Sequence, residues 1–338
     1  MALLEVNGLD VQFPMRQQPL QALRGVAFHL ERGERLGIVG ESGAGKSVLA
    51  FSLLNLLSRP GFINAGSIRF EGQELVGLSE RRLRRLRGRR LAMIFQDPMM
   101  TLNPLLTIGQ QMVETLHAHR RLTRREARAL AIGRLGHVQI AEPELRLRQY
   151  PHELSGGMRQ RVVIAIALLL DPDIIIADEP TTALDVTTQA NLIALLRQLC
   201  DKHNVGLILI SHDLGVINQL TQRTLVMYAG SIVEQGPTRV LINDAQHPYT
   251  QGLVNALPQL TPPRQRLRQI PGPLPDPLDS PVGCAFHPRC PYRFHDDGTP
   301  REDCLARAPR LESAGEGRVA CHWVRELHEI PTFEETST

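Results

Sequence analysis

The sequence predicts an α/β protein whose core is a parallel sheet covered by helices on both faces. Three segments carry this prediction: residues 91–96, 173–179 and 205–213 each contain an apolar run with no alternation of apolar and polar positions. Such runs are typical of strands buried on both faces of a parallel sheet. The chain has 338 residues, 42% of them apolar, which is enough for one large domain or two modest ones with a real core.

The remaining elements can be read in chain order. Residues 3–13 and 20–30, LLEVNGLDVQF and LQALRGVAFHL, read as alternating strands separated by a polar turn that contains proline. RLGIVG, residues 35–40, predicts a short buried strand ending in glycine. KSVLAFSLLNLL, residues 46–57, predicts a helix with apolar residues on most faces. Between residues 97 and 170 the pattern turns mostly helical, so we expect a helical insertion in the sheet domain.

Several global features limit the class of protein. The longest apolar run, VVIAIALLL at 162–170, is about half the length that a membrane-spanning helix requires, and it predicts a buried helix. The N-terminus has no signal-peptide pattern, so we expect a soluble, intracellular protein without structural disulfides. The arginine run at 81–90 lacks aromatic residues for base stacking. We expect it to form a solvated helix face, the alternative being contact with phospholipid headgroups or a neighbouring subunit, and we expect no nucleic-acid partner.

The composition changes after residue 257, where the predicted first domain (1–257) ends. Residues 258–281 hold eight prolines, which is typical of a stiff, extended linker, and the predicted linker covers 258–283. Four of the five cysteines lie beyond it. Residues 284–325 are therefore expected to form a separate, small, loop-rich extension, followed by a tail at 326–338.

A phosphate-binding loop is predicted at residues 40–47. GESGAGKS matches G-x-x-x-x-G-K-[ST] between a strand and a helix, so its glycines would let the backbone curl around a β-phosphate. Only two of the 38 basic residues are lysines, which indicates that position 46 needs a compact ammonium rather than a guanidinium. Ser47 would coordinate Mg²⁺. The predicted nucleotide-binding residues here are Gly40, Glu41, Ser42, Gly43, Ala44, Gly45, Lys46, Ser47 and Val48.

Four polar residues at the ends of buried strands are candidates for catalysis. Asp178 and Glu179 end IIIADE, where Asp178 would hold Mg²⁺ and Glu179 would polarise the attacking water. His212, in LISHD, would reach a γ-phosphate. Gln96, which ends LAMIFQ, would complete the metal and water shell. A phosphate loop on the same sheet favours these roles over a strand-end cap for the acidic pair and a structural role for the histidine.

The motif set resembles the ATP-binding subunits of ABC transporters over residues 3–257. GESGAGKS, Gln96, LSGGMRQ, IIIADE, TTALD and SHD occur in the order found in that family. The resemblance implies a P-loop ABC ATPase fold, with a RecA-like parallel sheet core, an antiparallel β subdomain and a helical subdomain. Met158, Thr182 and Phe13 replace the commoner glutamine, serine and tyrosine, and all three are compatible with activity. Phe13 would stack on adenine, the alternative being a buried strand residue.

LSGGMRQR, residues 154–161, predicts a helix that begins with two glycines, a feature that often binds phosphate. The chain already has a phosphate loop, so the purpose of a second such site has to be explained. The resemblance implies that this signature segment serves the ATP of another subunit, in a head-to-tail pair. The alternative is a structural helix that begins with glycines. The residues expected to serve the partner's ATP site are Ser155, Gly156, Gly157 and Gln160, together with Asp185, which would line the interface between the two subunits.

Four cysteines in the extension follow the spacing C-x5-C-x13-C-x16-C, which lacks the paired C-x2-C of common zinc sites and leaves any metal undecided. HPYTQGL, GCAFHPRC and VACHW resemble the C-terminal extension of the oligopeptide/dipeptide/nickel importer branch. That resemblance implies a [4Fe–4S] cluster, with Zn²⁺ or unliganded thiols as alternatives. The expected ligands are Cys284, Cys290, Cys304 and Cys321, whereas Cys200 is expected to be an ordinary buried cysteine.

The resemblance implies the ATP-hydrolysing motor of an importer for dipeptides or oligopeptides, using ATP and Mg²⁺. Its expected partners are a second ATPase subunit, two membrane permease subunits and, through them, an extracytoplasmic solute-binding protein. It would lie peripherally on the cytoplasmic face of the bacterial inner membrane. Nickel or another small solute is an alternative cargo. A soluble ABC ATPase acting on ribosomes, DNA or cluster assembly fits less well, because its ribosome-acting members usually carry two nucleotide domains in one chain and its DNA-repair members insert long coiled coils. A binding module with a degenerate ATP site fits poorly, because every expected catalytic position is filled.

Overall fold

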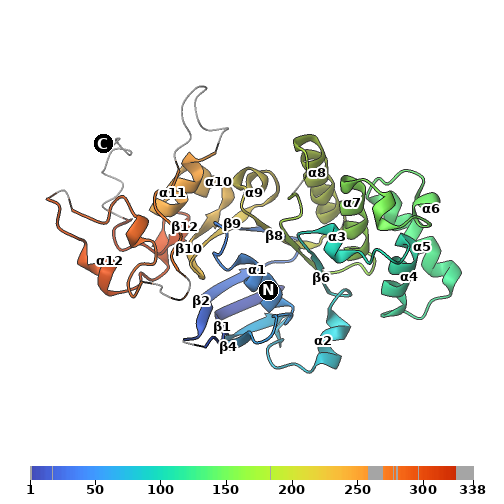
Figure 1. The fold of residues 1–338 in the computed structure, drawn as a ribbon, viewed down its shortest axis with the longest axis horizontal. Coiled ribbons are helices and arrows are strands. Elements are labelled where there is room, and N and C mark those ends of the chain that lie inside the picture. The colour runs from blue at the N-terminus through green and yellow to red at the C-terminus, as the bar shows by residue number, and fades with distance from the viewer. Residues whose placement is uncertain are drawn as a thin grey trace.

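The computed structural model describes residues 2–16, 18–182, 184–257, 269–276, 278, 281–295 and 297–324. Within them the strands form two sheets, a four-stranded one in the order β2-β1-β4-β5 and an eight-stranded one in the order β11-β12-β10-β9-β3-β8-β7-β6. Figure 1 shows the smaller sheet in blue below the centre of the molecule. The larger sheet passes through the middle, so both sheets meet near helix α1.

The four-stranded sheet is antiparallel. Its strands are β1 (Leu4–Phe13), β2 (Leu20–Leu30), β4 (Phe62–Phe70) and β5 (Gln73–Glu74). β1 pairs with β2 on one side and β4 on the other, and the register shifts next to Gly8, which has a φ of +56°. That bulge keeps apolar side chains on the inner face on both sides of it, where Leu4, Val6, Leu9 and Val11 are buried.

The centre of the eight-stranded sheet is parallel, as the non-alternating apolar runs predict. Its parallel strands are β3 (Arg35–Val39), β6 (Leu91–Ile94), β7 (Ile174–Asp178), β8 (Gly206–Ser211) and β9 (Arg223–Tyr228). Every residue of β7 and β8 is buried. The chain then turns back through β10 (Ser231–Pro237), which pairs with β9 in antiparallel fashion.

Helices cover this sheet and begin at well-defined caps. α1 (Lys46–Leu53) follows β3 and ends four residues earlier than the apolar pattern predicts, just before Asn55, whose φ of +50° is left-handed. α8 (Val186–His203) begins at Asp185 and α9 (Leu214–Leu220) at Asp213, each with the aspartate side chain accepting a backbone N–H.

The helical insertion lies at one end of the molecule, on the right of Figure 1. Capping boxes at Thr107 and Thr123 start its two longest outer helices. Within the described ranges, no helix is long and apolar enough to cross a membrane. The elements of the insertion are α3 (Pro98–Thr101), α4 (Ile108–His117), α5 (Arg124–His137), α6 (Pro143–Arg146), η1 (Pro151–Glu153) and the largely buried α7 (Gly156–Ala167).

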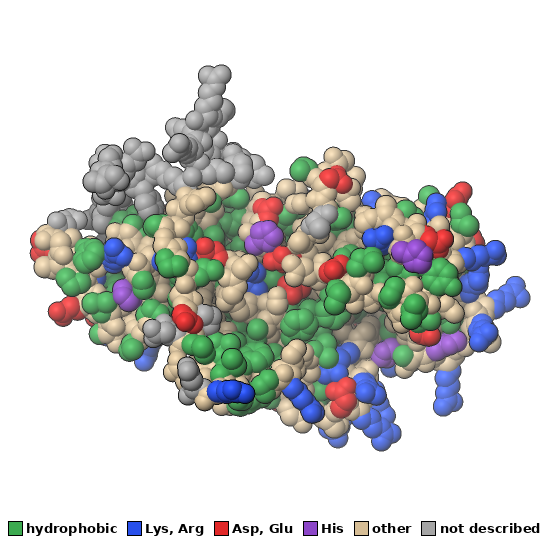
Figure 2. All heavy atoms as spheres, viewed as in Figure 1, with side chains coloured by type: hydrophobic (Ala, Val, Ile, Leu, Met, Phe, Trp, Pro, Cys, Tyr) green, Lys and Arg blue, Asp and Glu red, His purple; other side chains and the backbone are tan. Residues whose placement is uncertain are grey.

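The arginine run forms α2 (Glu80–Leu86) at the lower edge of the molecule, and Figure 2 shows basic side chains projecting there. Leu83 is buried beneath it, while Arg81, Arg82, Arg84 and Arg85 are exposed. The predicted solvated helix face is therefore present.

The C-terminal extension packs against the core instead of forming the separate module that its composition suggests. Hairpin β11 (Glu312–Ala314) and β12 (Gly317–Val319) continues the main sheet, because β12 pairs with β10. Residues 258–268, 277 and 279–280 of the predicted linker, and the whole predicted tail at 326–338, lie outside the described residues. The other elements on this side are α10 (Thr238–Asn243), α11 (Pro248–Asn255), η2 (His287–Arg289) and α12 (Glu302–Ala306).

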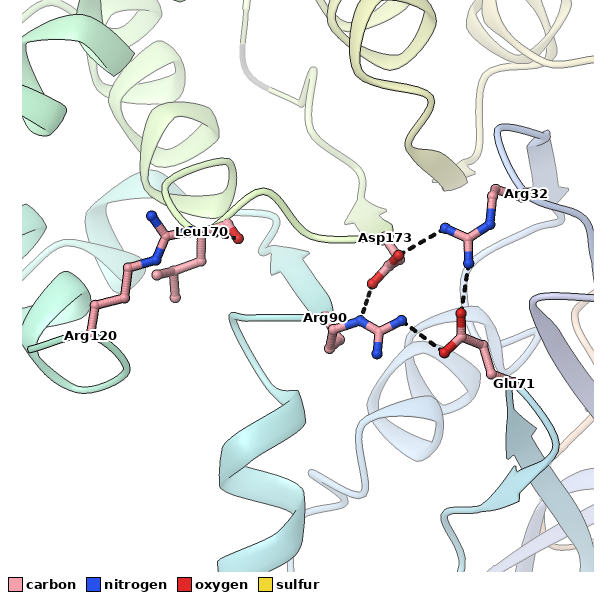
Figure 3. Close-up of polar contacts among 6 residues, drawn as sticks. All are labelled: Arg32, Glu71, Arg90, Arg120, Leu170 and Asp173. Atoms are coloured by element: carbon pink, nitrogen blue, oxygen red, sulfur yellow. Dashed lines mark hydrogen bonds and ion pairs between the residues drawn. The ribbon is translucent and has the colours of Figure 1, made fainter.

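An ion-pair ring links two turns of the four-stranded sheet to the starts of two strands of the eight-stranded sheet (Figure 3). Arg32 lies 2.6 Å from Glu71 and 2.9 Å from Asp173, while Arg90 lies 2.8 Å from Glu71 and also contacts Asp173. Arg32 and Glu71 come from turns after β2 and β4, whereas Arg90 and Asp173 directly precede β6 and β7. Two positive and two negative charges therefore alternate around the ring.

We expect Asp173→Asn to lower the free energy of unfolding at pH 7 by about 1–2 kcal/mol. Burial opposes the charged form, but hydrogen bonds from Arg90 and Arg32 bring the pKa of Asp173 below its ordinary value. Such a carboxylate stabilises the fold above the unfolded pKa of about 3.9, and the stabilisation is lost as the pH falls through the lower folded value. The difference between wild type and variant should therefore shrink below about pH 4.

Urea unfolding at stepped pH measures this effect. Asp303→Asn is the matched control, because Asp303 forms an exposed i,i+4 pair with Arg307 at 3.2 Å and should change stability by less than about 0.5 kcal/mol. Equal costs for the two variants at pH 7 would contradict the role assigned to the ring.

Candidate ATP site

A cavity of about 890 Å³ opens where β3, β7 and β8 end. Ligands of α/β proteins bind at this edge of a parallel sheet. The cavity also receives Phe13 from β1, Tyr228 from the end of β9, and Ala229 and Gly230 from the β9–β10 turn. Of the residues predicted from sequence, the structure places the following in its lining: Phe13, Glu41, Ser42, Gly43, Ala44, Gly45, Lys46, Ser47, Val48, Gln96, Glu179 and His212.

The glycine-rich loop curls around its own lysine. Lys46 Nζ donates to the carbonyl oxygens of Gly40 and Glu41 at 2.7 and 2.9 Å. Gly43 and Gly45 have φ values of +80° and +96°, and a Cβ on Gly45 would lie 2.8 Å from the Ala22 carbonyl oxygen. Glycine is therefore required at position 45. The free backbone N–H groups at the start of α1 complete an anion-binding turn.

Gly40 lies behind the cavity instead of in its lining. A Cβ at this position would be 2.3 Å from the Met227 carbonyl oxygen, so the loop can leave β3 beside β9 only with glycine here. Lys46 is itself buried. Burial lowers its pKa, an effect opposed by the charges of Glu179, Asp178 and Glu41. A bound phosphate would add to these opposing charges.

Asp178 ends β7 and is buried beside Ser47, in a second cavity that also contains Gln96. Its Oδ1 atom is buried without a hydrogen-bond partner. Burial raises the pKa of Asp178 against a hydrogen bond from Ser47 that lowers it. A hydroxyl, an amide and a carboxylate with an unsatisfied oxygen form a donor set that suits a hard cation such as Mg²⁺.

Glu179 is held in place by three polar side chains. Gln96 Nε2 and Thr182 Oγ1 donate to its Oε2 atom at 3.2 and 3.0 Å, and His212 Nδ1 lies 3.2 Å from Oε1. The glutamate itself has a left-handed φ of +47°. The sequence singled out Thr182 only as a departure from a motif, whereas the structure makes it a contact of Glu179.

The signature segment lies away from this cavity. Ser155 caps α7, its Oγ accepting from the Met158 N–H at 3.3 Å, and the space around Gly156 is open. Gly157 packs against Thr188 of α8, a helix that Asp185 caps. Among the described residues that line the ATP cavity, none comes from this segment. Gln160 is buried in α7.

The four cysteines of the extension line one small cavity, together with His247, His287, His322 and Trp323. Burial raises the pKa of each thiol, to about 12 for Cys290 and Cys321. Among the described residues, no group of three or more His, Cys, Asp or Glu side chains is arranged to hold a metal ion. The structure therefore brings the four predicted cysteine ligands to one cavity but shows no metal site among the described residues. Cys200 is buried in α8, as expected.

A glycine-rich loop between a strand and a helix, with a carboxylate pair at the end of a neighbouring parallel strand, defines a P-loop ATPase. Comparison of the sequence with known protein families agrees with this assignment. The family described as "ABC transporter" matches residues 23–182, and the family "Oligopeptide/dipeptide transporter, C-terminal region" matches residues 233–296. The chain belongs to the ATP-binding proteins of ABC transporters, because relatives of that kind are 44% and 50% identical to it over 96% and 86% of its length, and it is therefore an ATPase of this class.

Two relatives match along most of their length. The dipeptide transport ATP-binding protein DppD of Escherichia coli (strain K12) is 44% identical over 324 residues, which cover 96% of this chain and 97% of that protein. A putative peptide import ATP-binding protein of Brucella abortus (strain 2308) is 50% identical over 290 residues, covering 86% of this chain and 87% of the relative.

Solved structures give the same fold. The dimeric ATP-binding cassette MJ0796 bound to ADP and Pi has a TM-score of 0.63 at 26% identity, covering 70% of this chain and 99% of that one. CbiO1 from Clostridium perfringens, described as part of an ABC transporter complex, has a TM-score of 0.62 at 25% identity, covering 72% and 91%. These likenesses confirm the predicted P-loop ABC ATPase core.

Proposed function

We propose that the chain is the ATP-hydrolysing motor subunit of an ABC importer for dipeptides or oligopeptides. The observation that carries this proposal is the match to peptide-import relatives across nearly the whole chain, including the C-terminal region. Its partners would be a second ATPase subunit and two membrane permeases, which receive solute from an extracytoplasmic binding protein. The subunit would then lie on the cytoplasmic face of the bacterial inner membrane.

At the ATP site each polar residue has a specific task. The phosphate loop and Lys46 would bind the β- and γ-phosphates, while Phe13 would stack on the adenine. Ser47, Gln96 and Asp178 would hold Mg²⁺, which neutralises charge on the phosphates when bound. Glu179 would polarise the attacking water. His212, whose Nδ1 atom lies 3.2 Å from Glu179, would contact the γ-phosphate.

A second subunit would complete the site. Ser155, Gly156 and Gly157 would offer the start of α7 to the γ-phosphate of the partner, with Asp185 beside them at the seam and Gln160 behind them. The open space around Gly156 supports this arrangement, as does the dimeric state named for the related cassette MJ0796. ATP would then hold together two surfaces that otherwise carry unpaired phosphate-binding groups.

Affinity purification from gently solubilised native membranes tests the transport role. The tagged chain is expected to bring down two multi-span membrane proteins and a second ATPase, identified by mass spectrometry. An associated solute-binding protein would indicate the cargo when its bound ligand is identified. A purely soluble complex, with no membrane protein at comparable abundance, would overturn the proposal.

The cysteine cavity has a second proposed role, as the site of a [4Fe–4S] cluster. Four thiols converge on one cavity, and burial keeps them protonated unless a cation offsets the cost of the thiolate. Four cysteine thiolates are the usual ligand set of such a cluster. Zn²⁺ is the alternative occupant.

We expect anaerobically purified protein to absorb broadly near about 400 nm and to contain iron and sulfide, and Cys290→Ser to remove the absorption. Cys200→Ser is the matched control, because Cys200 lies in α8 and should leave the spectrum unchanged. Stoichiometric zinc without iron would show that the site binds Zn²⁺ instead of a cluster. Protein containing neither metal would show that the thiols are free.

A further inference from the structure

The C-terminal extension reaches the phosphate loop directly. Arg289, at the end of η2, donates from Nη1 to Glu41 Oε2 at 2.7 Å and from Nη2 to Oε1 at 3.1 Å. Glu41 is the second residue of the loop and is 248 positions away in sequence. The Arg289 side chain is only 5% exposed. A bidentate, largely buried guanidinium–carboxylate pair is both strong and geometrically specific.

Contacts with residues other than Glu41 also hold the Arg289 side chain in place. Its Nε donates to the Pro271 carbonyl oxygen at 2.9 Å, and the guanidinium lies 5.9 Å from the centre of the Tyr228 ring. The next residue is Cys290, whose backbone N–H bonds back to the His287 carbonyl oxygen at 3.1 Å. The position of the guanidinium therefore depends on the short turn that carries two of the four cysteines, Cys284 and Cys290.

A second contact reaches the same loop residue. The Glu41 backbone N–H donates to Tyr249 Oη at 2.8 Å. The Tyr249 ring packs on Tyr228 and on Phe286, with ring centroids 4.7 and 5.4 Å apart, and Phe286 belongs to the extension. Both the side chain and the backbone of Glu41 are thus held by groups packed against the extension.

These contacts lie beside the lysine of the loop. The Glu41 carbonyl oxygen accepts one of the two hydrogen bonds that hold Lys46. Leu274 and Pro275, which precede the extension, also line the ATP cavity. Residues after position 257 therefore line part of this cavity and also hold its phosphate loop in place.

We propose that Arg289 is a positioning residue for ATP binding. By fixing Glu41, it holds the phosphate loop in the shape that receives the phosphates, and it makes the fold of the extension a determinant of ATP affinity. This inference rests on the proposed ATP site. Arg289 does not touch the catalytic group Glu179, so its loss should weaken ATP binding and leave the rate at saturating ATP nearly unchanged.

Calorimetric titration of the full chain with MgATP tests this. Arg289→Met keeps the bulk of the side chain and is expected to raise the Kd about tenfold. Arg289→Lys should bind MgATP more tightly than Arg289→Met but more weakly than wild type, because an ammonium cannot make the bidentate contact with Glu41. Arg310→Met is the matched control, because Arg310 is an exposed arginine of the extension and its replacement should leave the Kd unchanged.

A double-mutant cycle with Glu41→Gln separates this role from a general loss of structure. If Arg289 acts through Glu41, the double variant should bind MgATP no more weakly than the worse single variant. Additive effects, or a Kd within about twofold of wild type for Arg289→Met, would overturn the inference. If Arg289→Met does not fold, Arg289→Lys and Glu41→Gln still decide between these outcomes.

Lys46→Ala distinguishes a failure of the proposed ATP site from a failure of the positioning role of Arg289. If it binds MgATP as tightly as wild type, the proposed ATP site itself is wrong. If it abolishes binding while Arg289→Met has no effect, only the positioning role fails.

Discussion

Glu179→Gln is expected to lower the ATPase rate at least about 100-fold and to leave MgATP binding within about twofold of wild type. Glutamine keeps the length of the side chain and its contacts with Gln96 and Thr182, which lie 3.2 and 3.0 Å from the carboxylate. It loses the negative charge that, in the proposed mechanism, polarises the attacking water. Phosphate release from the purified complex and calorimetric titration with MgATP measure the two effects separately.

The control for this variant is Glu144→Gln, which changes an exposed glutamate in α6 and should leave the rate unaltered. A Glu179→Gln protein that hydrolyses ATP at the wild-type rate would remove Glu179 from the catalytic role. Loss of binding together with turnover would instead indicate that the glutamate supports the fold of the site.

Gly156→Asp should have an effect of similar size for a different reason. Nothing lies within 4 Å of a Cβ at this position, so the substitution should not disturb the fold of the subunit. In a head-to-tail pair, however, it would place a negative charge against the γ-phosphate of the partner. We expect the ATPase rate of the pair to fall at least about 100-fold, while each subunit still binds MgATP at its own phosphate loop.

Gly133→Asp offers a matched comparison, because Gly133 is also an exposed helical glycine with open space around it. It should change the rate little. If both aspartate variants behave alike, the glycines of α7 have no special place in the reaction. Light scattering in the presence of MgATP adds an independent readout, since only Gly156→Asp should prevent association of the subunits.

Much of the fold could be predicted because its core depends on local pattern. The apolar runs of β7 and β8 contain no alternation and lie in the centre of a parallel sheet, as expected. The phosphate loop could be predicted for a similar reason. Its glycines, its lysine and the following helix are contiguous, so spacing alone specifies the geometry.

The parts that sequence did not predict depend on contacts between distant residues. Arg289 is one of many arginines in the chain, and nothing in its neighbourhood indicates that it reaches Glu41. The proline-rich composition after residue 257 favours an independent module, yet two short strands join that module to the main sheet. Pairing of a three-residue strand leaves almost no periodic signal in the sequence.

Strand β12 has a consequence for the solubility of the protein. By pairing with Glu234 and Gln235 it covers part of the edge of β10, and the outermost strand is then β11, which has only three residues. The opposite edge, β6, has four. Short edges are poor templates for pairing with another chain, so the extension protects the eight-stranded sheet against edge-to-edge aggregation. A chain cut after residue 257 would expose the edge of the seven-residue β10.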